Sequence, residues 1–400
     1  MPQQSYKFVV VGAGLAGVSA VEAIRERDES GGIMLFGSER HLPYHRPPLS
    51  KKLWSGEKKI SDIFVHDMEF FDNNDIDLAL GTSIVGLDLS GKTVSDSAGN
   101  VFSFEKLLIA TGGLARRLVI PGGDLDGVIY FRDLDGYYKA RNEAKEGKSA
   151  VVIGGGFIGS EMAASLALIK LEVTWIFRGE YPLKRVFPAD LARAIQDEYR
   201  NRGVRILNDE PKSIERSGGK LVTTTGSGLR VESDLVIVGI GIEPSVKLVR
   251  DAGLGIDDGL LVDERLRTTH PDVYAAGDIA RFPYTALGKT MRVEHWDNAL
   301  NQGKLAGANM AGADEPYTYM PYFFSDLFDF GYEAVGDIDA GLQTFEDWQD
   351  EYKKGVIYYL ENEKVRGAML CNVWDKVDAA RELIRSGRQA TTDDLRGAIR

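Results

Sequence analysis

The first clear hydrophobic pattern of the chain lies near its beginning. Residues 7–11 are a short run of strand-forming side chains, and residues 18–24 carry apolar side chains at helical spacing. Between the two segments stand the glycines of a G-x-G-x-x-G motif, Gly12, Gly14 and Gly17. The pattern therefore predicts a strand, a tight glycine turn and a helix.

Each glycine of this motif has its own physical purpose. Gly12 lets the chain reverse, Gly14 lets the backbone approach a pyrophosphate, and Gly17 lets the helix lie close to the strand. A second apolar run, residues 33–36, is followed by Glu39, an acid at a suitable distance to bind a ribose hydroxyl. With a strand before it and a helix after it, the motif predicts a dinucleotide site, with a chance turn as the alternative.

The same pattern recurs after residue 149. A strand-like run at residues 150–153 precedes a second set of three glycines, Gly154, Gly156 and Gly159, and a helical pattern follows. Two dinucleotide folds in one enzyme most simply indicate two cofactors that exchange electrons. The alternative is a structural duplicate that binds nothing.

The second fold continues with a strand at residues 171–177, a helix at 191–202 and a β-rich run at 234–240. A helix at residues 133–144 precedes it. The run at 234–240 is closed by the glycine pair Gly239 and Gly241. The glycine turn at residues 121–123 marks a crossover into this second domain.

A proline-rich loop, residues 41–51, lies between the two motifs. Its three prolines exclude a helix or a central strand there. It carries Arg46 and Lys51, two cations that would suit a pyrophosphate and an electron-accepting ring. A stiff surface turn is the alternative.

Further segments of the sequence are predicted to belong to the first dinucleotide fold. Strands are predicted at residues 84–89, 106–110 and 260–266, and a short strand at 273–276 precedes Gly277 and Asp278. An Asp at the carboxyl end of a parallel strand faces the ligand crevice, where it can bind a sugar or ribityl hydroxyl. A helix N-cap is the alternative role for Asp278. A helix starts in the segment from residue 291 and runs to about residue 310.

The last part of the chain differs in composition. Aromatic residues crowd together from residue 317 to 330, and segments 332–335, 355–360 and 365–370 indicate antiparallel strands. A helix at residues 375–386 closes this part, and residues 389–400 form a tail or a short helix. Most of the aromatic residues are expected in the core.

Composition narrows the class of protein. The chain has 400 residues, of which 44% are hydrophobic, so it can bury a large core. A net charge of −12 argues against nucleic acid or an anionic membrane surface as a partner. No signal peptide, transit peptide, membrane span or metal-ligand spacing is visible. The single cysteine, Cys371, is expected to be a buried apolar side chain, and we expect a cytoplasmic enzyme.

Several motifs together resemble one family. In chain order they are GAGLAG with its downstream acid, LPYHRPPLSKKLW, LLIATGG, GGGFIGSE, VYAAGD, RVEHWDNAL, FSDLFDFGYEAVG and KKGVIYYLENEKVRGAMLCNVW. The chain resembles the FAD-dependent pyridine-nucleotide oxidoreductases, in the branch of apoptosis-inducing factor, ferredoxin reductases and monodehydroascorbate reductase. The resemblance covers nearly the whole chain.

The resemblance implies an α/β, glutathione-reductase-like fold with two Rossmann-like domains and a C-terminal α+β domain. The FAD-binding domain would comprise residues 1–117 and 246–316, the NAD(P)H-binding domain residues 118–245, and the α+β domain residues 317–400. FAD and NADH, or NADPH, would be the cofactors. Hydride would pass from the nicotinamide to the flavin N5, and then electrons to an acceptor.

The resemblance also implies individual roles at the flavin. Arg46 would lie along the phosphates, Lys51 near the flavin N5, and Asp278 at the ribityl chain. The residues implied to bind FAD are Gly12, Gly14, Leu15, Ala16, Gly17, Glu39, Arg46, Lys51, Ile84, Ala110, Thr111, Gly112, Arg132, Gly277, Asp278, Glu294, His295, Trp296 and Phe324.

At the second site Phe157 would cover the flavin face until nicotinamide stacks there, and Glu161 would pair with Lys51 and orient the carboxamide. The competing interpretation of that pair is a fold-stabilising ion pair. The residues implied to bind NAD(P) are Gly154, Gly156, Phe157, Ile158, Gly159, Glu161, Arg178, Glu180, Gly239 and Gly241. Lys51, Glu161, Phe157 and His295 would form the catalytic set.

Some features depart from the family pattern. Phe324 stands where relatives place a Trp or Tyr beside the flavin, which keeps a stacking face without a polar group. The long acidic insertion of the animal cell-death proteins is absent. Glu180 favours NADH, whereas Arg178 would suit the 2′-phosphate of NADPH, so NADH is the expected coenzyme with NADPH as the alternative.

The acceptor and the main role stay open at this point. A [2Fe–2S] ferredoxin, a rubredoxin, a quinone, oxygen or monodehydroascorbate would each be compatible, and so would a homodimer. The competing class is a redox-sensing flavoprotein with slow turnover, whose NADH-reduced charge-transfer complex controls conformation or dimerisation. A disulfide reductase or peroxidase needs a cysteine near the flavin, and the loop at residues 41–51 has none.

Overall fold

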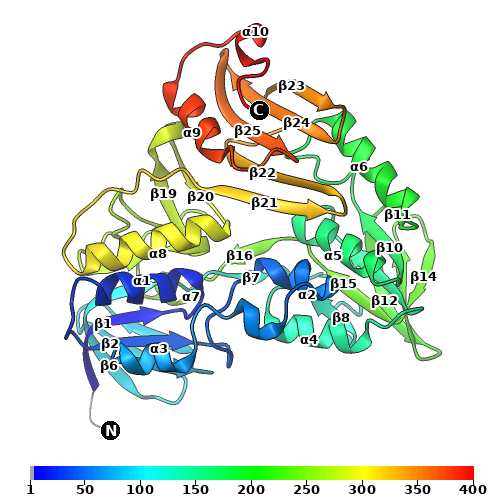
Figure 1. The fold of residues 1–400 in the computed structure, drawn as a ribbon. Coiled ribbons are helices and arrows are strands. Elements are labelled where there is room, and N and C mark those ends of the chain that lie inside the picture. The colour runs from blue at the N-terminus through cyan, green and yellow to red at the C-terminus, as the bar shows by residue number, and fades with distance from the viewer. Residues whose placement is uncertain (1–3) are drawn as a thin grey trace. The chain divides into compact units, whose positions relative to one another are not determined.

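The computed structural model describes residues 4–400, and its backbone contacts divide the chain into two units (Figure 1). Unit 1 comprises the chain up to His45, Ile60–Leu114 and Glu243–Pro321, and unit 2 comprises Arg46–Lys59, Ala115–Ile242 and Tyr322–Arg400. The predicted absence of a signal or transit peptide concerns a segment whose first three residues lie outside the described range. The three-domain division stays a prediction.

Unit 1 is built on a mixed sheet of strand order β3-β2-β1-β6-β5-β4, with β18 paired to β6. Strands β3, β2, β1, β6 and β18 are parallel, and β5 and β4 extend the sheet in antiparallel fashion. The strands are β1 (Gln4–Val11), β2 (Ile33–Gly37), β3 (Ile76–Leu80), β4 (Ile84–Asp88), β5 (Thr93–Asp96), β6 (Val101–Ile109) and β18 (Val273–Ala275). Because β1 lies between β2 and β6, the first glycine turn stands where the strand order reverses, which is where α/β sheets bind ligands.

The remaining elements of unit 1 surround this sheet. A small sheet is formed by β17 (Leu260–Leu261), β19 (Ala280–Tyr284) and β20 (Lys289–Arg292). The helices are α1 (Leu15–Arg25), η2 (Ile60–Ile63), α3 (Met68–Asn73), α7 (Lys247–Asp251), η3 (Gly277–Ile279), η4 (Thr285–Leu287) and α8 (Trp296–Met310). Strands β7 (Gly113–Ala115) and β16 (Ile242–Pro244) pair where the chain leaves and re-enters the unit.

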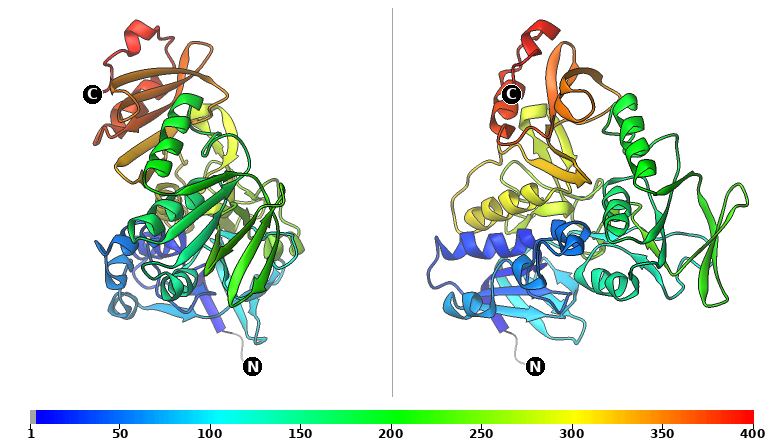
Figure 2. Two further views of the ribbon diagram at one scale, coloured as in Figure 1. Left: turned by 90° about the vertical axis from the view of Figure 1, so that its right-hand side faces the viewer. Right: turned by 45° about the vertical axis from the view of Figure 1, so that its right-hand side comes forward.

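Helices α1 and α8 lie side by side along unit 1 (Figures 1 and 2). A Cβ atom on Gly303 would stand 2.3 Å from the carbonyl oxygen of Ala16, and one on Gly307 would stand 2.2 Å from that of Ala20. Since no side chain fits at either distance, the glycines of α8 allow its backbone to approach α1. The packing fixes the helix that begins at the first glycine turn.

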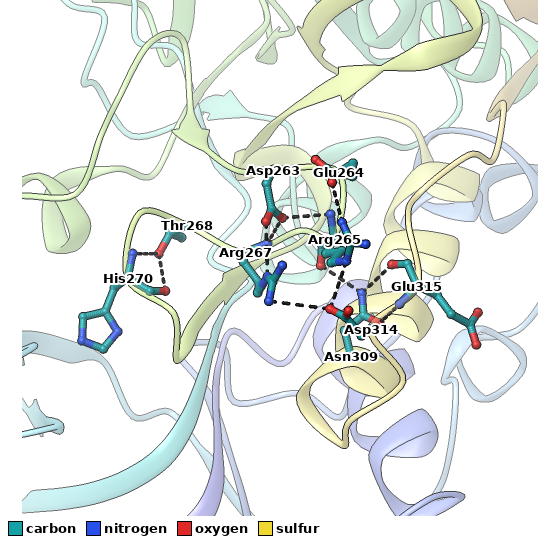
Figure 3. A network of polar contacts seen from close by, with 9 residues as sticks. All are labelled: Asp263, Glu264, Arg265, Arg267, Thr268, His270, Asn309, Asp314 and Glu315. Carbon is teal, nitrogen blue, oxygen red and sulfur yellow. Dashed lines mark hydrogen bonds and ion pairs between the residues drawn. The ribbon is translucent and has the colours of Figure 1, made fainter.

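A polar network fastens the end of α8 to the loop before β18 (Figure 3). Asn309 donates its amide to the carbonyl oxygen of Arg265 over 3.0 Å, and Arg265 pairs with Asp314 at 3.0 Å. Within the loop, Asp263 accepts from the Arg267 backbone N–H at 2.9 Å and from its Nε at 3.2 Å. These contacts fasten the loop before β18 to the end of α8 and the segment that follows it.

Asp272, just before β18, binds two lysines of unit 1. We predict that the stability of the fold depends on the ionisation of this carboxylate and so falls at acid pH. Its carboxylate accepts from Lys106 at 2.6 Å and from Lys92 at 2.5 Å, and these two contacts lower the pKa of Asp272 to about 2. Because the folded-state pKa is below the unfolded value, the stabilisation is complete above about pH 4 and is lost as pH falls towards 2. We expect Asp272→Asn to lower the free energy of unfolding by about 1–2 kcal/mol at pH 7.

Denaturant unfolding of the wild type and of Asp272→Asn at pH 7 and pH 3 would measure this effect. The difference between the two proteins should shrink at the lower pH. Glu29→Gln, at an exposed position, is the control and should cost less than about 0.5 kcal/mol. A deficit of equal size at both pH values would refute the electrostatic account of Asp272.

Unit 2 contains the second nucleotide fold. Its parallel sheet has the order β11-β10-β9-β15-β8, so the strand before the second glycine motif again lies at the centre. The strands are β8 (Val128–Tyr130), β9 (Ser149–Ile153), β10 (Glu172–Phe177), β11 (Arg205–Asn208) and β15 (Leu235–Val238). The helices are η1 (Pro47–Ser50), α2 (Lys52–Ser55), α4 (Leu134–Glu143), α5 (Phe157–Leu168) and α6 (Ala189–Asn201).

An antiparallel sheet of three strands packs on this fold, as the green strands in Figure 2 show. It consists of β12 (Pro211–Ser217), β13 (Lys220–Thr225) and β14 (Arg230–Ser233). Buried Ile214, Leu221 and Val231 of this sheet share one core cluster with Val151 of β9 and Val236 of β15. The sequence pattern did not predict this sheet.

The C-terminal part of unit 2 is an antiparallel sheet of order β21-β22-β25-β24-β23, covered by α9 against β22 and β25 (Figure 1). The strands are β21 (Tyr322–Leu327), β22 (Phe330–Gly336), β23 (Gln343–Asp350), β24 (Lys354–Glu361) and β25 (Lys364–Cys371). Helices α9 (Val377–Ser386) and α10 (Thr392–Leu395) close the chain. The predicted strands, closing helix and short terminal helix are confirmed here.

Three local predictions were wrong. The proline-rich loop contains a 3-10 turn, η1, because Pro47 and Pro48 occupy its first positions, where a missing N–H costs nothing. The helix expected from residue 291 begins only at Trp296, after strand β20. The strand expected at residues 260–266 is limited to β17, since the chain turns at Asp263–Leu266.

Candidate functional site

The first glycine turn has the geometry of a phosphate cradle. Gly12 has φ of +121°, and a Cβ atom there would stand 2.2 Å from the carbonyl oxygen of Ala110. A Cβ atom on Gly17 would stand 1.9 Å from the carbonyl oxygen of Gly12. At Gly14, by contrast, no heavy atom of residues 4–400 lies within 4 Å of the Cβ position. Two glycines are therefore needed for the turn itself, and the third faces open space that a ligand can use.

The second turn repeats this arrangement. Gly154 has φ of +124°, with its Cβ position 2.2 Å from the carbonyl oxygen of Gly239, and the Cβ position of Gly159 lies 1.9 Å from the carbonyl oxygen of Gly154. Gly156 again has open space, free of described heavy atoms within 4 Å. The second turn therefore repeats the geometry of the first, with room for a phosphate group beside Gly156.

The two helices that follow the turns present positive ends. Gly14 is the N-cap of α1 and Gly156 the N-cap of α5, and neither helix has an acidic residue in its first turn. Leu15, Ala16 and Ile158 lie in these first turns, and Ile158 is 36% exposed. Unpaired backbone N–H groups and the helix dipole therefore favour an anion such as a pyrophosphate at both places.

Unit 1 gathers a second group of predicted residues at the carboxyl ends of β1, β6 and β18. Ala110 donates its N–H to Val11 at 2.8 Å, and Thr111 donates its hydroxyl to Ser245 at 3.2 Å. The Cβ position of Gly277 lies 3.1 Å from the Cβ of Ala16. The remaining members, Gly112 and Asp278, directly follow Thr111 and Gly277 in the chain. These residues lie at the sheet edge where α/β folds bind their ligands.

The alternative role of Asp278 as a helix N-cap is not what the structure shows. Asp278 lies inside η3, whose N-cap is Ala276 without a side-chain cap. Its position after a parallel strand of unit 1 is as predicted, since β18 pairs in parallel with β6.

Glu39 follows β2 at this same edge. Its carboxylate accepts from the Tyr44 hydroxyl at 2.6 Å, and its carbonyl oxygen accepts from the N–H of Gly81 at 2.9 Å. Gly81 lies shortly before Ile84 in the chain, and Ile84 begins strand β4. The phenol orients the acid from one side.

The segment before α8 holds three further predicted residues. His295 is partly buried, and desolvation lowers its pKa to about 4, against the opposing effect of Asp278. His295 is therefore neutral at pH 7. Glu294 pairs with Arg292 at 2.6 Å, and the Trp296 indole donates to His45 at 3.0 Å. The three side chains are thus held in place rather than mobile.

Unit 2 contains a buried ion pair between Lys51 and Glu161. The Lys51 Nζ lies 3.2 Å from Glu161 Oε1, and the two side chains are only 8% and 7% exposed. Lys51 also donates to the carbonyl oxygen of Phe324 at 3.2 Å, and its ammonium lies 4.4 Å from the centre of the Phe324 ring. This pair unites the proline-rich loop, helix α5 and strand β21 within one unit.

Aromatic and cationic residues predicted for the flavin side also belong to unit 2. The rings of Phe157 and Phe323 meet edge to face with centres 5.3 Å apart. Arg46 donates to the carbonyl oxygen of Arg132 at 3.1 Å. Arg46, Lys51, Arg132 and Phe324 are therefore grouped with the second nucleotide fold, whereas the other predicted FAD residues belong to unit 1.

The residues expected at the adenosine ribose of NAD(P) are both engaged in ion pairs. Arg178 pairs with Glu210 at 2.5 Å, and Glu180 pairs with Arg193 at 3.3 Å. Asn208 donates to the carbonyl oxygens of Gly179 and Glu180. Gly241, with φ of +99°, completes the turn beyond β15.

Several residues of these sites had no signal in the sequence. Ser50 and Ser325 both donate to Glu161, Tyr44 to Glu39, and Glu210 receives Arg178. The spacing of residues in the sequence does not show which partner a hydroxyl in a loop or on a strand will contact. Ser50 alone could have been found, because it directly precedes Lys51 in the PPLSK motif.

The remaining sequence predictions concern Cys371, metal-ligating side chains and membrane-spanning helices. Burial raises the pKa of the Cys371 thiol well above its usual value, and the residue is inaccessible on β25. Within residues 4–400 no His, Cys, Asp and Glu side chains gather in a group that could hold a metal ion. Over the same range no helix has the length and apolar character to cross a membrane.

The fold and the site together define an oxidoreductase that uses two dinucleotides. Residues 6–303 match the model of the pyridine nucleotide-disulphide oxidoreductases, and residues 306–349 and 345–386 match that of the C-terminal domain of mitochondrion-associated apoptosis-inducing factor. The chain belongs to the pyridine nucleotide-disulphide oxidoreductase family. Its fold class, its FAD and NAD(P)H cofactors and its redox activity are thereby confirmed as predicted.

Individual relatives agree with this family. The chain is 36% identical to a rubredoxin-NAD(+) reductase of Pseudomonas putida over 80% of this chain and 84% of that protein. It is 34% identical to monodehydroascorbate reductase 2 of Arabidopsis thaliana over 92% and 91% of the two chains. Among solved structures, the covalent putidaredoxin reductase–putidaredoxin complex matches with a TM-score of 0.91 and 28% identity, over 97% of this chain and 95% of that one.

Proposed function

We propose that this protein is an NADH-dependent flavoprotein reductase that delivers electrons to a small iron–sulfur or rubredoxin-type protein. The observation that carries the proposal is the buried Lys51–Glu161 pair next to a glycine cradle with an open Cβ position. Relatives named rubredoxin reductase and putidaredoxin reductase support the choice of acceptor. When bound, FAD accepts a hydride from the nicotinamide coenzyme and releases its electrons singly.

The side chains of the protein would supply binding and orientation. Gly14 and Gly156 leave room for the pyrophosphates, Glu39 binds a ribose diol, and Asp278 binds the ribityl chain. Lys51 would favour negative charge on the flavin by simple attraction, and Glu161 would hold Lys51 in place. No nucleophile is needed, because the cofactors carry the chemistry.

The remaining roles follow the same proposal. Phe157 would cover the flavin until the nicotinamide stacks there, and the neutral His295 would line the flavin pocket. The residues of the carboxyl-end group, the aromatic Phe324 and Trp296, and the cations Arg46 and Arg132 would complete the FAD site. We also propose a cytoplasmic location, since a single buried cysteine suits a reducing compartment.

An acceptor panel tests the proposal. The purified protein, reduced anaerobically with NADH, is mixed with a ferredoxin, a rubredoxin, a quinone or oxygen, and reoxidation is followed at rising salt concentration. A protein acceptor should react fastest, and its rate should fall with salt, because a chain of net charge −12 needs a local basic patch to attract an acidic partner. Fastest reaction with a quinone or oxygen, without a salt effect, would sink the assignment of the acceptor.

Coenzyme preference gives a separate prediction. Because Glu210 occupies the guanidinium of Arg178, this arginine is engaged and less able to bind a 2′-phosphate. Replacing Glu210 by glutamine should release Arg178 and raise the kcat/KM ratio of NADPH to NADH about threefold to fivefold, the size expected of an exposed ion pair. Steady-state kinetics with both coenzymes measure the ratio.

The matched control is Glu215→Gln. Glu215 lies on strand β12, which begins directly after Glu210, and the variant loses the ion pair with Arg230, whose N···O distance is 2.5 Å. It should leave the ratio unchanged. If both variants shift the ratio alike, Glu210 has no specific role in coenzyme choice.

A further inference from the structure

The carboxylate of Glu161 receives three donors. Lys51 Nζ lies 3.2 Å from Oε1, Ser325 donates its hydroxyl to Oε1 over 2.6 Å, and Ser50 donates its hydroxyl to Oε2 over 2.5 Å. All of these groups are buried, with Ser50 2% and Ser325 1% exposed. Both carboxylate oxygens are therefore bonded in an environment away from solvent.

The three donors come from two distant parts of the sequence, residues 50–51 and Ser325, but from one unit. Ser50 ends the 3-10 turn η1 and Ser325 lies on β21, and Glu161 stands on α5. One turn further along α5, Ser165 donates to the carbonyl oxygen of Ser50 at 2.6 Å, which holds η1 against the helix. Strand β21 contributes twice, since the carbonyl oxygen of Phe324 accepts from Lys51.

Two phenols also face Glu161, those of Tyr199 on α6 and Tyr332 on β22. Burial, and next the charge of Glu161, raise the pKa values of both tyrosines well above the usual value. Hydrogen bonds to a carboxylate are among the stronger ones in proteins, so Lys51 and the two serine hydroxyls fix the position of Glu161.

We propose that Ser50 and Ser325 are positioning residues that hold the Glu161 carboxylate on Lys51. This inference rests on the proposed function and deepens it, because it makes strand β21 of the C-terminal sheet a part of the hydride-transfer site. Without the two hydroxyl donors the Glu161 carboxylate would be free to turn away, and the Lys51 ammonium would lose its fixed position.

The test uses the holoprotein and the variants Ser50→Ala, Ser325→Ala and their combination. The limiting rate of NADH-driven flavin reduction is measured by anaerobic stopped flow. We expect this rate to be about 10-fold lower in the double variant than in the wild type. Ser325→Thr, which keeps a hydroxyl, should keep most of the wild-type rate.

A second readout does not depend on turnover. Acylation of Lys51, followed by peptide mass spectrometry, reports how firmly its amine is held. We expect about threefold faster labelling in the double variant. Ser233→Ala, which removes the hydroxyl of another completely buried serine in β14, is the matched control and should change neither readout.

The outcomes separate the two hypotheses. A rate deficit with unchanged labelling of Lys51 would show that the serines are merely structural and would overturn the proposal. If NADH fails to reduce even the wild-type flavin, the proposed function is wrong. Faster labelling of Lys51 in the double variant would still support the positioning role.

Discussion

Gly14→Ala should be purified as a folded protein without flavin, whereas Gly156→Ala should be yellow and should no longer respond to NADH. Both Cβ positions face open space among the described residues, so neither methyl group disturbs the fold. Both backbones have extended conformations that alanine adopts without strain, with φ of −83° and −95°. The methyl group would instead occupy the path of the pyrophosphate.

We expect about 10- to 100-fold weaker FAD binding in Gly14→Ala, and a similar weakening of NADH binding in Gly156→Ala. Flavin content after purification, and NADH titration of the reconstituted proteins, measure the two affinities. Each variant is the control of the other, since they share chemistry and local geometry but lie in different nucleotide folds. Loss of both cofactors in either variant would indicate general misfolding and contradict the assignment of one coenzyme to each turn.

Removing Lys51 should have the largest effect on stability. In Lys51→Met the carboxylate of Glu161 is left buried without a cation, so the free energy of unfolding should fall by about 3–5 kcal/mol. In the double variant Lys51→Met/Glu161→Gln no buried charge is left unpaired, and most of the loss should be regained. Flavin reduction by NADH should stay slow in both, because the proposed role of Lys51 is catalytic as well as structural.

Denaturant unfolding of the wild type, both single variants and the double variant completes this cycle. Lys148→Met is a suitable control, since its pair with Asp234 is on the surface and Lys148 is 51% exposed. It should cost less than about 1 kcal/mol. If Lys51→Met and the double variant were equally unstable, the cost would arise from lost packing and not from the charge of Glu161.

The nucleotide folds were predictable because their signals are local. In each nucleotide fold, one short segment of sequence holds the spacing of apolar residues and the glycines that predict a strand and the following helix. The two pairs are β1 with α1 and β9 with α5. The sheet β12–β14 was missed because its strands are half polar, as in PKSIERS, and are exposed on one face. Strand β23, QTFEDWQD, was missed for the same reason at a sheet edge.

The candidate site was predictable only in part. The glycine motifs were predicted from the residues themselves, and the Lys51–Glu161 pair was expected from the resemblance to a family. The serines on Glu161 were not, because Ser50 is 111 residues away from it in the chain and Ser325 is 164. Such a contact is decided by tertiary packing and has no trace in periodicity. The same holds for Glu210, which directly precedes β12 and pairs with Arg178, the residue after β10.

Anaerobic titration of the purified protein with NADH tests the central claim most directly. The account predicts a yellow protein that loses its visible flavin absorbance with one equivalent of NADH per bound FAD. A protein that cannot be reconstituted with FAD, or a bound flavin that stays oxidised in excess NADH and NADPH, would contradict it.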